Sequence, residues 1–330
     1  MSNARTLADN LPTVGQIGNR NLIINGAMEV AQRGTSSTSY GYVSLDRWYV
    51  NQSGGSTTFS QETNSNPSET GGLQKYARVN VSSSSDYTGI FQRIEDVTFV
   101  PEGTVTISFY AKGTAPTGGV KVWATQVFGS GGSSDVNIAE QVIASSLTSS
   151  WVRYTLNMTV PSLDGKTIGA NSNFLISIGQ GTDTASTAYD LNITGIQLEV
   201  GSQSTPFEHE PYEVSLRKCE RYFQTYSKRH WQATNEHPTN YMMYCDGVFR
   251  QKMRAAPTVT FIGTVTVARP QVGVTQRPNE LIGLSTEGFQ AFRWPTSGTY
   301  GGQLGSYGDT YYRMSVGDAP TNRLDFDAEL

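Results

Sequence analysis

Residues 104–113 read TVTISFYAKG, and apolar side chains occupy every second position of this run. The apolar set is Val105, Ile107, Phe109 and Ala111, with Thr106, Ser108 and Tyr110 between its members. A period of two is typical of a β-strand that has one face in a core and the other in solvent. The run therefore predicts one strand of an antiparallel sheet.

A second run, residues 189–201 (YDLNITGIQLEVG), carries a more specific signal. Its apolar side chains change parity between Ile193 and Ile196. A strand that kept a strict period of two would turn one half of these residues away from the core. A β-bulge at Thr194–Gly195 would return them to the same face, so we predict a bulge there.

The composition extends this pattern to the whole chain. Gly, Ser and Thr make up 105 of the 330 residues, against 52 charged ones. A coiled coil would be rich in Ala, Glu, Lys, Leu and Arg, and a doubly wound enzyme would show helical periods between its strands. Short alternating runs separated by turn-rich loops instead predict an all-β protein, an antiparallel jelly-roll β-sandwich followed by one short helix and a second, smaller β domain.

The chain divides into four parts. We expect an extended N-terminal anchoring arm over residues 1–20, the sandwich over 21–210, a connecting helix over 211–226 and a C-terminal β domain over 227–330 that serves as the receptor-binding tip. The arm is polar and short, so we expect it to become ordered on a partner. Its apolar anchors are Leu7, Leu11, Val14 and Ile17.

The connecting helix is predicted by apolar residues spaced four, three, four and three apart. These are Tyr212, Leu216, Cys219, Phe223 and Tyr226. The stripe has two explanations. It packs on the sandwich of its own chain, or it forms a self-association seam, although two heptads are too few to hold a coiled coil alone.

A search for catalytic patterns finds none of the common ones. The nucleophile elbow, the phosphate-binding loop, the dinucleotide-binding glycines, the zinc-protease motif and the Cys-x-x-Cys pair are all missing from the sequence. The three histidines, His209, His230 and His237, lack the spacing and the further donors of a zinc site. We therefore predict no catalytic residues, no metal and no cofactor.

Charge and hydropathy exclude two classes of partner. The formal net charge is −4 with no long run of either sign, which argues against nucleic acid as a partner. No segment approaches the roughly 18 apolar residues of a membrane helix, and the N-terminus has no apolar signal region. We therefore expect that the protein does not insert into a membrane and that it is made in a cytoplasm. Its two cysteines are too few for a disulfide framework.

Aromatic and glycine residues are concentrated between Phe289 and Tyr312. This stretch of 24 residues holds seven aromatic residues and five glycines. Rigid rings beside small residues are typical of recognition surfaces, and they suit the apolar C–H faces of sugars. The candidate glycan-binding residues are Trp294, Tyr300, Tyr307, Tyr311 and Phe292. The alternative is that these rings fill the core of the small domain.

Several short motifs occur in one order along the chain and resemble the motif string of bacteriophage tail-fibre and related virion proteins. They lie at residues 21–34 (NLIINGAMEVAQRG), 45–48 (LDRW), 108–113 (SFYAKG), 195–201 (GIQLEVG), 205–208 (TPFE) and 219–223 (CERYF). Residues 253–260 (MRAAPTVT) and 327–330 (DAEL) are similar to the ends of such fibres.

The resemblance implies a jelly-roll domain similar to carbohydrate-binding modules, a location in the virion, assembly as a homotrimer and contact with host surface polysaccharide. It implies no catalytic residues. The arm would attach to a tail adaptor or nozzle in a tail fibre, or to a capsid protein in a head fibre or decoration protein. Only about 20 residues precede the sandwich, whereas long tail fibres usually begin with a sizeable adaptor. A third, less favoured alternative is a glycan depolymerase, which would need convergent carboxylates.

Overall fold

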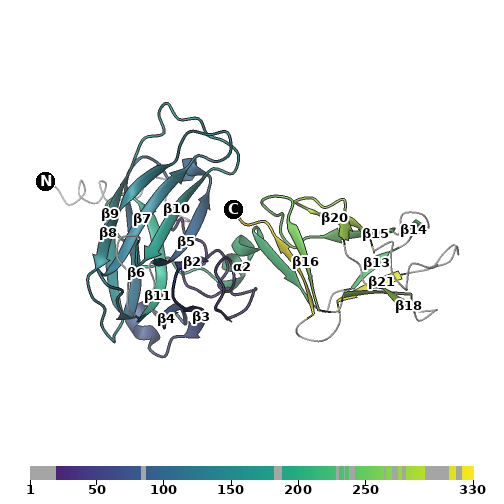
Figure 1. Cartoon of the computed structure of the whole chain (residues 1–330), viewed down its shortest axis with the longest axis horizontal. Coiled ribbons are helices and arrows are strands. Elements are labelled where there is room, and N and C mark those ends of the chain that lie inside the picture. The colour runs from purple at the N-terminus through teal and green to yellow at the C-terminus, as the bar shows by residue number, and fades with distance from the viewer. Residues whose placement is uncertain are drawn as a thin grey trace, which may run out of the picture. The chain divides into compact units, whose positions relative to one another are not determined.

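The computed structural model describes residues 20–82, 87–181, 188–227, 230–233, 235–237, 242–263, 265–269, 274–276, 280–293, 312–316 and 322–330. These residues confirm the prediction of an all-β protein built on an antiparallel jelly-roll sandwich, because every strand pair they contain is antiparallel. The α-helix of the described part of the chain is α2 (Tyr212–Glu220). Figure 1 shows the strands and the helix, with a colour that runs along the chain from the N-terminus to the C-terminus.

The sandwich consists of two sheets that face each other (Figure 1). The first sheet has the strand order β1 (Ser36–Ser37), β3 (Thr57–Thr63), β4 (Lys75–Val81), β11 (Tyr189–Val200), β6 (Gly103–Thr114) and β9 (Val152–Val160). The second has the order β2 (Tyr49–Ser53), β5 (Tyr87–Glu95), β10 (Asn173–Gly179), β7 (Val120–Val127) and β8 (Val136–Ala144). Two 3₁₀ turns, η1 (Pro67–Thr70) and η2 (Val97–Phe99), lie in the connections.

The chain repeatedly crosses from one sheet to the other, which makes the sandwich a jelly roll. It changes sheet between β4 and β5, between β5 and β6, and again between β6 and β7. Late strands therefore lie in the middle of each sheet, with β11 between β4 and β6 and β10 between β5 and β7. Greek-key connections, which are typical of jelly rolls, place strands that are distant in sequence side by side in this way.

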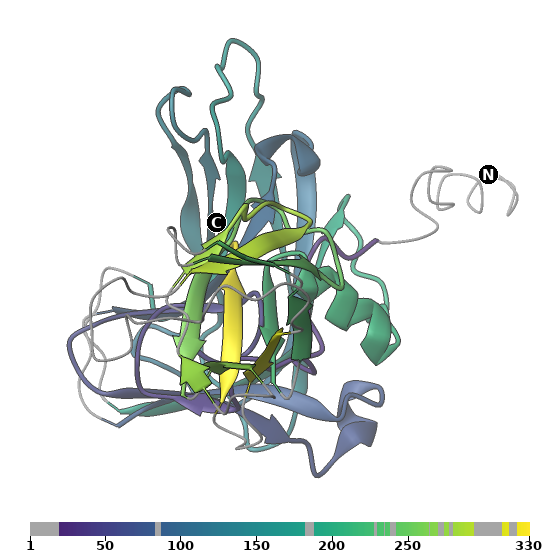
Figure 2. The same ribbon diagram turned by 90° about the vertical axis from the view of Figure 1, so that its right-hand side faces the viewer.

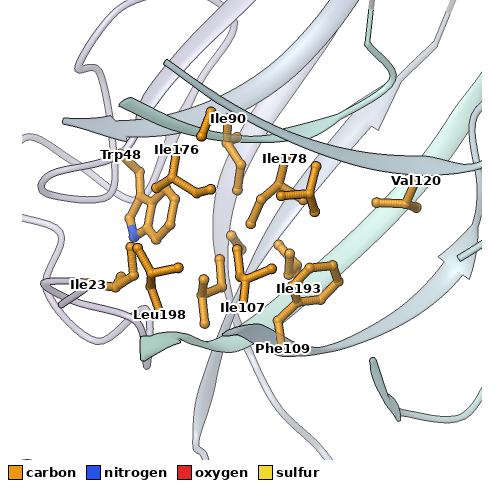
Figure 3. Close-up of a cluster of buried hydrophobic side chains, with 14 of the residues drawn as sticks. Ile23, Trp48, Ile90, Ile107, Phe109, Val120, Ile176, Ile178, Ile193 and Leu198 are labelled. Carbon is orange, nitrogen blue, oxygen red and sulfur yellow. The ribbon is translucent and has the colours of Figure 1, made fainter. Parts of the chain in front are cut away.

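The inner faces of the two sheets enclose the core. Figure 3 shows side chains of the two sheets pointing toward one another, with the indole of Trp48 at one end between Ile176 and Leu198. The first sheet contributes Ile107, Phe109, Ile193 and Leu198, and the second contributes Ile90, Val120, Ile176 and Ile178. All of these side chains are buried, as alternating apolar residues on two facing sheets require.

The predicted strand at residues 104–113 has the expected core face, but its other face is not in solvent. Thr106 and Ser108 are completely buried. The segment that follows β11 folds back over this face, where the Thr106 hydroxyl donates to the carbonyl of Gly201 at 2.6 Å. The Glu199 carboxylate accepts from the backbone N–H of Thr205 at 3.0 Å. Polar side chains at the outward-facing positions of these strands therefore bind the segment of the same chain that follows β11.

The predicted bulge is confirmed. The register between β11 and β6 shifts between Thr194 and Gln197, and Gly195 has a φ of 62°. Ile193 and Ile196 are both buried in the same core as a result. Glycine suits this position because the left-handed region is costly for residues with a Cβ.

Asn25 joins the N-terminal motif to the segment that carries Trp48, just before β2. Its side-chain amide donates to the carbonyls of Val30 at 2.9 Å and Asp46 at 3.0 Å, and its Oδ1 accepts from the N–H of Val30 at 3.0 Å. The indole Nε1 of Trp48 donates to the carbonyl of Asn25 at 3.1 Å. These motif residues are buried and satisfy one another, so they hold the fold together.

The boundary between the two compact units of the chain falls between Ser215 and Leu216, five residues beyond the predicted end of the sandwich at residue 210. The described residues of the C-terminal unit form three antiparallel sheets. The first has the order β12 (Phe223–Tyr226), β22 (Arg323–Asp327) and β16 (Thr258–Ile262), seen side by side in Figure 2. The second has the order β13 (His230–Ala233), β21 (Tyr312–Val316), β17 (Val265–Arg269) and β18 (Val274–Gln276). The third has the order β14 (Asn235–His237), β15 (Met242–Val248), β20 (Gly288–Arg293) and β19 (Glu280–Ile282).

The predicted helix over residues 211–226 is too long. The helix ends at Glu220, and Phe223 and Tyr226 lie in β12, paired with β22. The side-chain amide of Gln224 donates to the carbonyl of Glu220 at 3.0 Å, which satisfies a carbonyl at the helix end. Pairing with β22, which comes about a hundred residues later in the sequence, overrides the local helical spacing.

Candidate functional site

The structure does not test the predicted glycan-binding and anchoring residues, which lie outside its described part except for the backbone of Phe292. Trp294, Tyr300, Tyr307 and Tyr311 lie outside the described residues, as does the side chain of Phe292, whose backbone belongs to β20. The anchoring set Leu7, Leu11, Val14 and Ile17 also lies outside them. Both assignments stay predictions.

The predicted self-association stripe does not form one continuous face. Cys219, Phe223 and Tyr226 are buried, and the ring of Tyr226 packs edge to face on Phe326 with 5.6 Å between centroids. Tyr212, in contrast, is 48% exposed. Three of the five residues therefore pack inside the C-terminal unit of their own chain, and self-association stays a prediction.

The strongest candidate site among the described residues is the outer face of the β2-β5-β10-β7-β8 sheet. Strand alternation turns Val50, Ile90, Ile178 and Val122 into the core, so their neighbours point outward. The register places Tyr49 opposite Phe91, Phe91 opposite Ser177 and Ser177 opposite Trp123. A row of three aromatic residues and one serine therefore crosses four strands.

The aromatic side chains of this face contact one another. Tyr49 and Phe91 are stacked, with 4.5 Å between ring centroids and 15° between planes. Tyr42, from the loop before β2, meets Tyr49 edge to face at 5.1 Å. Tyr87 meets Trp123 in the same manner at 6.0 Å. These side chains are half-buried except Phe91, which is 6% exposed. We call Tyr42, Tyr49, Phe91, Tyr87 and Trp123 the aromatic face.

Glycine at position 89 makes this arrangement possible. Gly89 lies one row beyond Phe91 and faces Gly179 on β10. A Cβ at this position would lie 3.1 Å from Cη2 of Trp123 and 3.4 Å from the hydroxyl of Tyr87. The rings of Trp123 and Tyr87 occupy the space that a side chain at position 89 would fill, so glycine at this position allows the two rings to contact each other.

Polar groups surround these rings. Lys121 and Glu140 form an ion pair at 3.1 Å. The Ser177 hydroxyl, which lies between Phe91 and Trp123, is buried and has no hydrogen-bond partner among the described residues. A buried hydroxyl without a partner costs free energy, and this one is closed to solvent, so the ligand-accessible polar groups of the face lie around the rings. The face thus offers stacking surface and hydrogen-bonding groups together.

The Tyr87 hydroxyl is in an environment that disfavours its ionised form. Burial raises the pKa of Tyr87 to about 12, and the negative charge of Glu140 acts in the same direction. A hydrogen bond with Asn51 opposes this rise. Tyr87 is therefore a neutral phenol at ordinary pH and able to donate or accept a hydrogen bond.

Arg93 lies beside the stacked pair. Its guanidinium carbon is 5.0 Å from the ring centroid of Phe91 and 5.7 Å from that of Tyr49. One guanidinium nitrogen, Nη1, donates to the hydroxyl of Tyr42 at 3.4 Å. The cation is held on the rings and remains half-buried.

The arrangement is suited to binding a flat, partly apolar ligand with hydroxyl groups. Rings along a sheet supply contact area at low entropic cost, and polar groups between them fix orientation. In the described part of the chain, no group of three or more His, Cys, Asp or Glu side chains is placed to hold a metal ion. None of the helices described there has the length and apolar character needed to cross a membrane.

Sequence reasoning missed this face, although a signal for it was present. Trp123 is the aromatic residue at an outward position of the alternating run VKVWATQV, where a strand usually carries a polar or small side chain. Phe91 occupies the same parity in YTGIFQRIE. A large aromatic residue on the solvent parity of a strand is the feature to look for. That these residues share one row depends on the pairing of strands far apart in sequence.

Comparison with known proteins gives structural similarity at low identity. No family model matches the chain. No curated protein matches it either. Among solved structures, the family 11 carbohydrate-binding module of Clostridium thermocellum, in complex with a β-1,3-1,4-mixed-linked tetrasaccharide, is 12% identical and covers 52% of this chain and 98% of that one, with a TM-score of 0.32.

Two phage structures are similar at the same level. The enzymatically active domain of tailspike protein 4 of bacteriophage CBA120 is 12% identical, with 55% of this chain and 21% of that one covered and a TM-score of 0.33. The tripod from the baseplate of bacteriophage Tuc2009 is 13% identical, with 59% of each chain covered and a TM-score of 0.29. Because these TM-scores are below 0.5, the functional proposals below depend on the residues of this chain.

Proposed function

We propose that this chain is a phage virion protein, a tail fibre that binds host surface polysaccharide through the aromatic face of its sandwich. The observation that carries the binding role is the row of Tyr49, Phe91, Ser177 and Trp123 across four strands, with Arg93 beside it. Stacked rings with polar groups between them fit the apolar face and the hydroxyl rim of a sugar. The order of motifs over residues 21–226 supports the virion location.

We assign the face a binding role and no catalytic one. A glycoside hydrolase needs one carboxylic acid and one carboxylate flanking the scissile bond. Glu140 is engaged in an ion pair with Lys121, which favours a structural or ligand-positioning role for this carboxylate. Incubation with bound polysaccharides should release no new reducing ends, whereas their release would favour the depolymerase alternative.

The binding proposal is tested with the full chain and two matched variants. Trp123→Ala removes a half-buried ring of the aromatic face, and Tyr154→Ala removes a half-buried ring on β9 of the other sheet. Removal of an aromatic ring that anchors a ligand lowers affinity by about 10- to 100-fold. On a panel of bacterial surface polysaccharides we expect Trp123→Ala to lose binding by at least tenfold and Tyr154→Ala to retain it. Equal binding by the two variants would contradict the proposal.

The virion location and the proposed homotrimer need different experiments. Images of whole particles with the protein labelled should show it on the tail, and density on the head would favour the head-fibre or decoration alternative. Removal of residues 1–20 should release the protein from the particle if this arm attaches it. The mass of the purified chain in solution tests the trimer directly.

A further inference from the structure

We propose that the glycan bound by the aromatic face carries carboxylate groups and that Arg93 binds them. The ligand class is thus an acidic polysaccharide built from uronic acids. This inference rests on the proposed function and adds to it the chemistry that the ligand must have. Arg93 is the residue that distinguishes an acidic glycan from a neutral one of the same shape.

The position of the Arg93 guanidinium is fixed by the rings beneath it. It lies over Phe91 and Tyr49, the two rings that stack on each other, and contacts the hydroxyl of Tyr42. An arginine held in this way loses little further side-chain entropy when it binds a ligand. The aromatic face therefore presents a preorganised cation at the edge of its sugar-binding rings.

This cation has no carboxylate partner among the described residues. Two other cations near the face differ in this respect, since Lys121 pairs with Glu140 at 3.1 Å and Arg33 pairs with Asp46 at 3.8 Å. Glu95, two residues along the same strand, has an interaction of its own.

The hydrogen-bonding capacity of the guanidinium is also largely unused. It carries five N–H donors, and in the described part of the chain one of them is used, by the Tyr42 hydroxyl. An unpaired cation with free donors, half-buried beside aromatic rings, is a site for an anion.

A carboxylate suits this site better than other acceptors. The planar fork of arginine binds a carboxylate through two parallel hydrogen bonds, which are shorter and stronger than those to a neutral hydroxyl. In a uronic acid the carboxylate is attached to the sugar ring itself. Binding it at Arg93 would bring that ring beside Phe91 and Tyr49, so one residue sets both charge and register.

The test compares each uronic acid oligosaccharide with the same oligosaccharide after its carboxylates are reduced to alcohols. The panel contains oligomers of galacturonate, glucuronate, mannuronate and guluronate, titrated into the full chain by calorimetry. We expect the wild type to bind at least one acidic oligomer about 10- to 100-fold more tightly than its reduced form, as a charge-assisted hydrogen bond predicts. We expect Arg93→Gln to abolish this preference, so that the acidic oligomer and its reduced form bind the variant with equal affinity.

Two further variants separate a specific carboxylate site from a general effect of charge. Arg93→Lys keeps the charge without the fork and should retain part of the preference. Lys112→Gln removes a cation that lies over Trp151 at 4.7 Å and Tyr76 at 5.7 Å on the opposite sheet, and it should leave the preference intact. Thermal melting of each variant verifies that it is folded before binding is compared.

The outcomes separate this inference from the proposed function. Equal affinity for acidic and reduced oligomers, or a preference that survives Arg93→Gln, would overturn the inference. Binding of sulfated but not carboxylated oligomers would also overturn it. If a neutral glycan binds in a Trp123-dependent manner and no acidic one does, the inference fails and the proposed function stands. If binding does not depend on Trp123, the proposed function itself fails.

Discussion

At the residue scale, a few side chains give the aromatic face its chemistry. Gly89 lets Tyr87 and Trp123 lie together, Ser177 contributes a buried hydroxyl, and Arg93 contributes a cation. Tyr87 belongs to the same face and has a raised pKa, which gives it a measurable pH signature. Its pKa of about 12 results mainly from burial, which the hydrogen bond with Asn51 opposes and the negative charge of Glu140 reinforces to a smaller extent.

The raised pKa of Tyr87 predicts a loss of stability in alkali. In the unfolded chain a tyrosine titrates near 10, so below pH 10 both states hold the proton and the contribution is constant. Between about pH 10 and pH 12 the unfolded chain loses the proton first, and the free energy of unfolding falls by up to about 2 kcal/mol. Tyr87→Phe keeps the ring and removes this part of the pH dependence. Urea unfolding at pH 9 and pH 11.5 measures it, with the exposed Tyr40→Phe as control. An unchanged pH dependence in Tyr87→Phe would contradict the assignment.

At the element scale, the bulge in β11 decides which side chains reach the core. Gly195 at the bulge has a φ of 62°, and a Cβ there would lie 2.7 Å from Cδ1 of Leu73 and 3.0 Å from Cδ2 of Tyr110. Gly165 has a similar φ of 72° with no atom within 4 Å of the added Cβ. The two glycines therefore share the conformational requirement and differ in packing.

Alanine substitutions at these two glycines separate backbone strain from packing. Gly165→Ala should reduce the free energy of unfolding by about 1 kcal/mol, the cost of a left-handed alanine. Gly195→Ala should lose that amount and about 1 to 3 kcal/mol more, because Leu73 and Tyr110 are crowded. Urea unfolding followed by tryptophan fluorescence gives both values. Equal losses would show that the bulge has room for a side chain.

At the scale of the whole molecule, the chain has two compact units, and each unit has buried apolar side chains of its own. Phe326 is buried in the C-terminal unit, where its ring centroid lies 4.7 Å from Phe249 and 6.0 Å from Phe289. Phe174 is buried in the core of the sandwich. Each phenylalanine reports on the stability of its own unit.

Truncation of these two phenylalanines identifies the unit that binds glycan. Phe326→Ala should destabilise the C-terminal unit by about 3 to 5 kcal/mol, and Phe174→Ala should do the same to the sandwich. Differential scanning calorimetry should show a different transition shifted in each variant. At a temperature where only the C-terminal unit of Phe326→Ala has unfolded, we expect glycan binding to persist. Loss of binding there would place the site in the C-terminal unit, as the aromatic and glycine residues between Phe289 and Tyr312 first indicated.

The sequence by itself determined which residues form strands and which face of each strand is apolar. The alternation at residues 104–113 and the parity change at Thr194–Gly195 are local signals, because side-chain direction in a strand follows directly from position. The same local reasoning failed at Phe223 and Tyr226, whose helical spacing gave way to pairing with β22.

Only the tertiary structure decided what lies beside what. Tyr49, Phe91, Ser177 and Trp123 are separated by up to 128 positions, and they form one row because β2, β5, β10 and β7 pair in that order. Strand order in a jelly roll is set by the burial of both inner faces at once, which no single stretch of sequence encodes. The same pairing leaves Arg93 on two aromatic rings without a carboxylate among the described residues, and from that arrangement the acidic ligand is inferred.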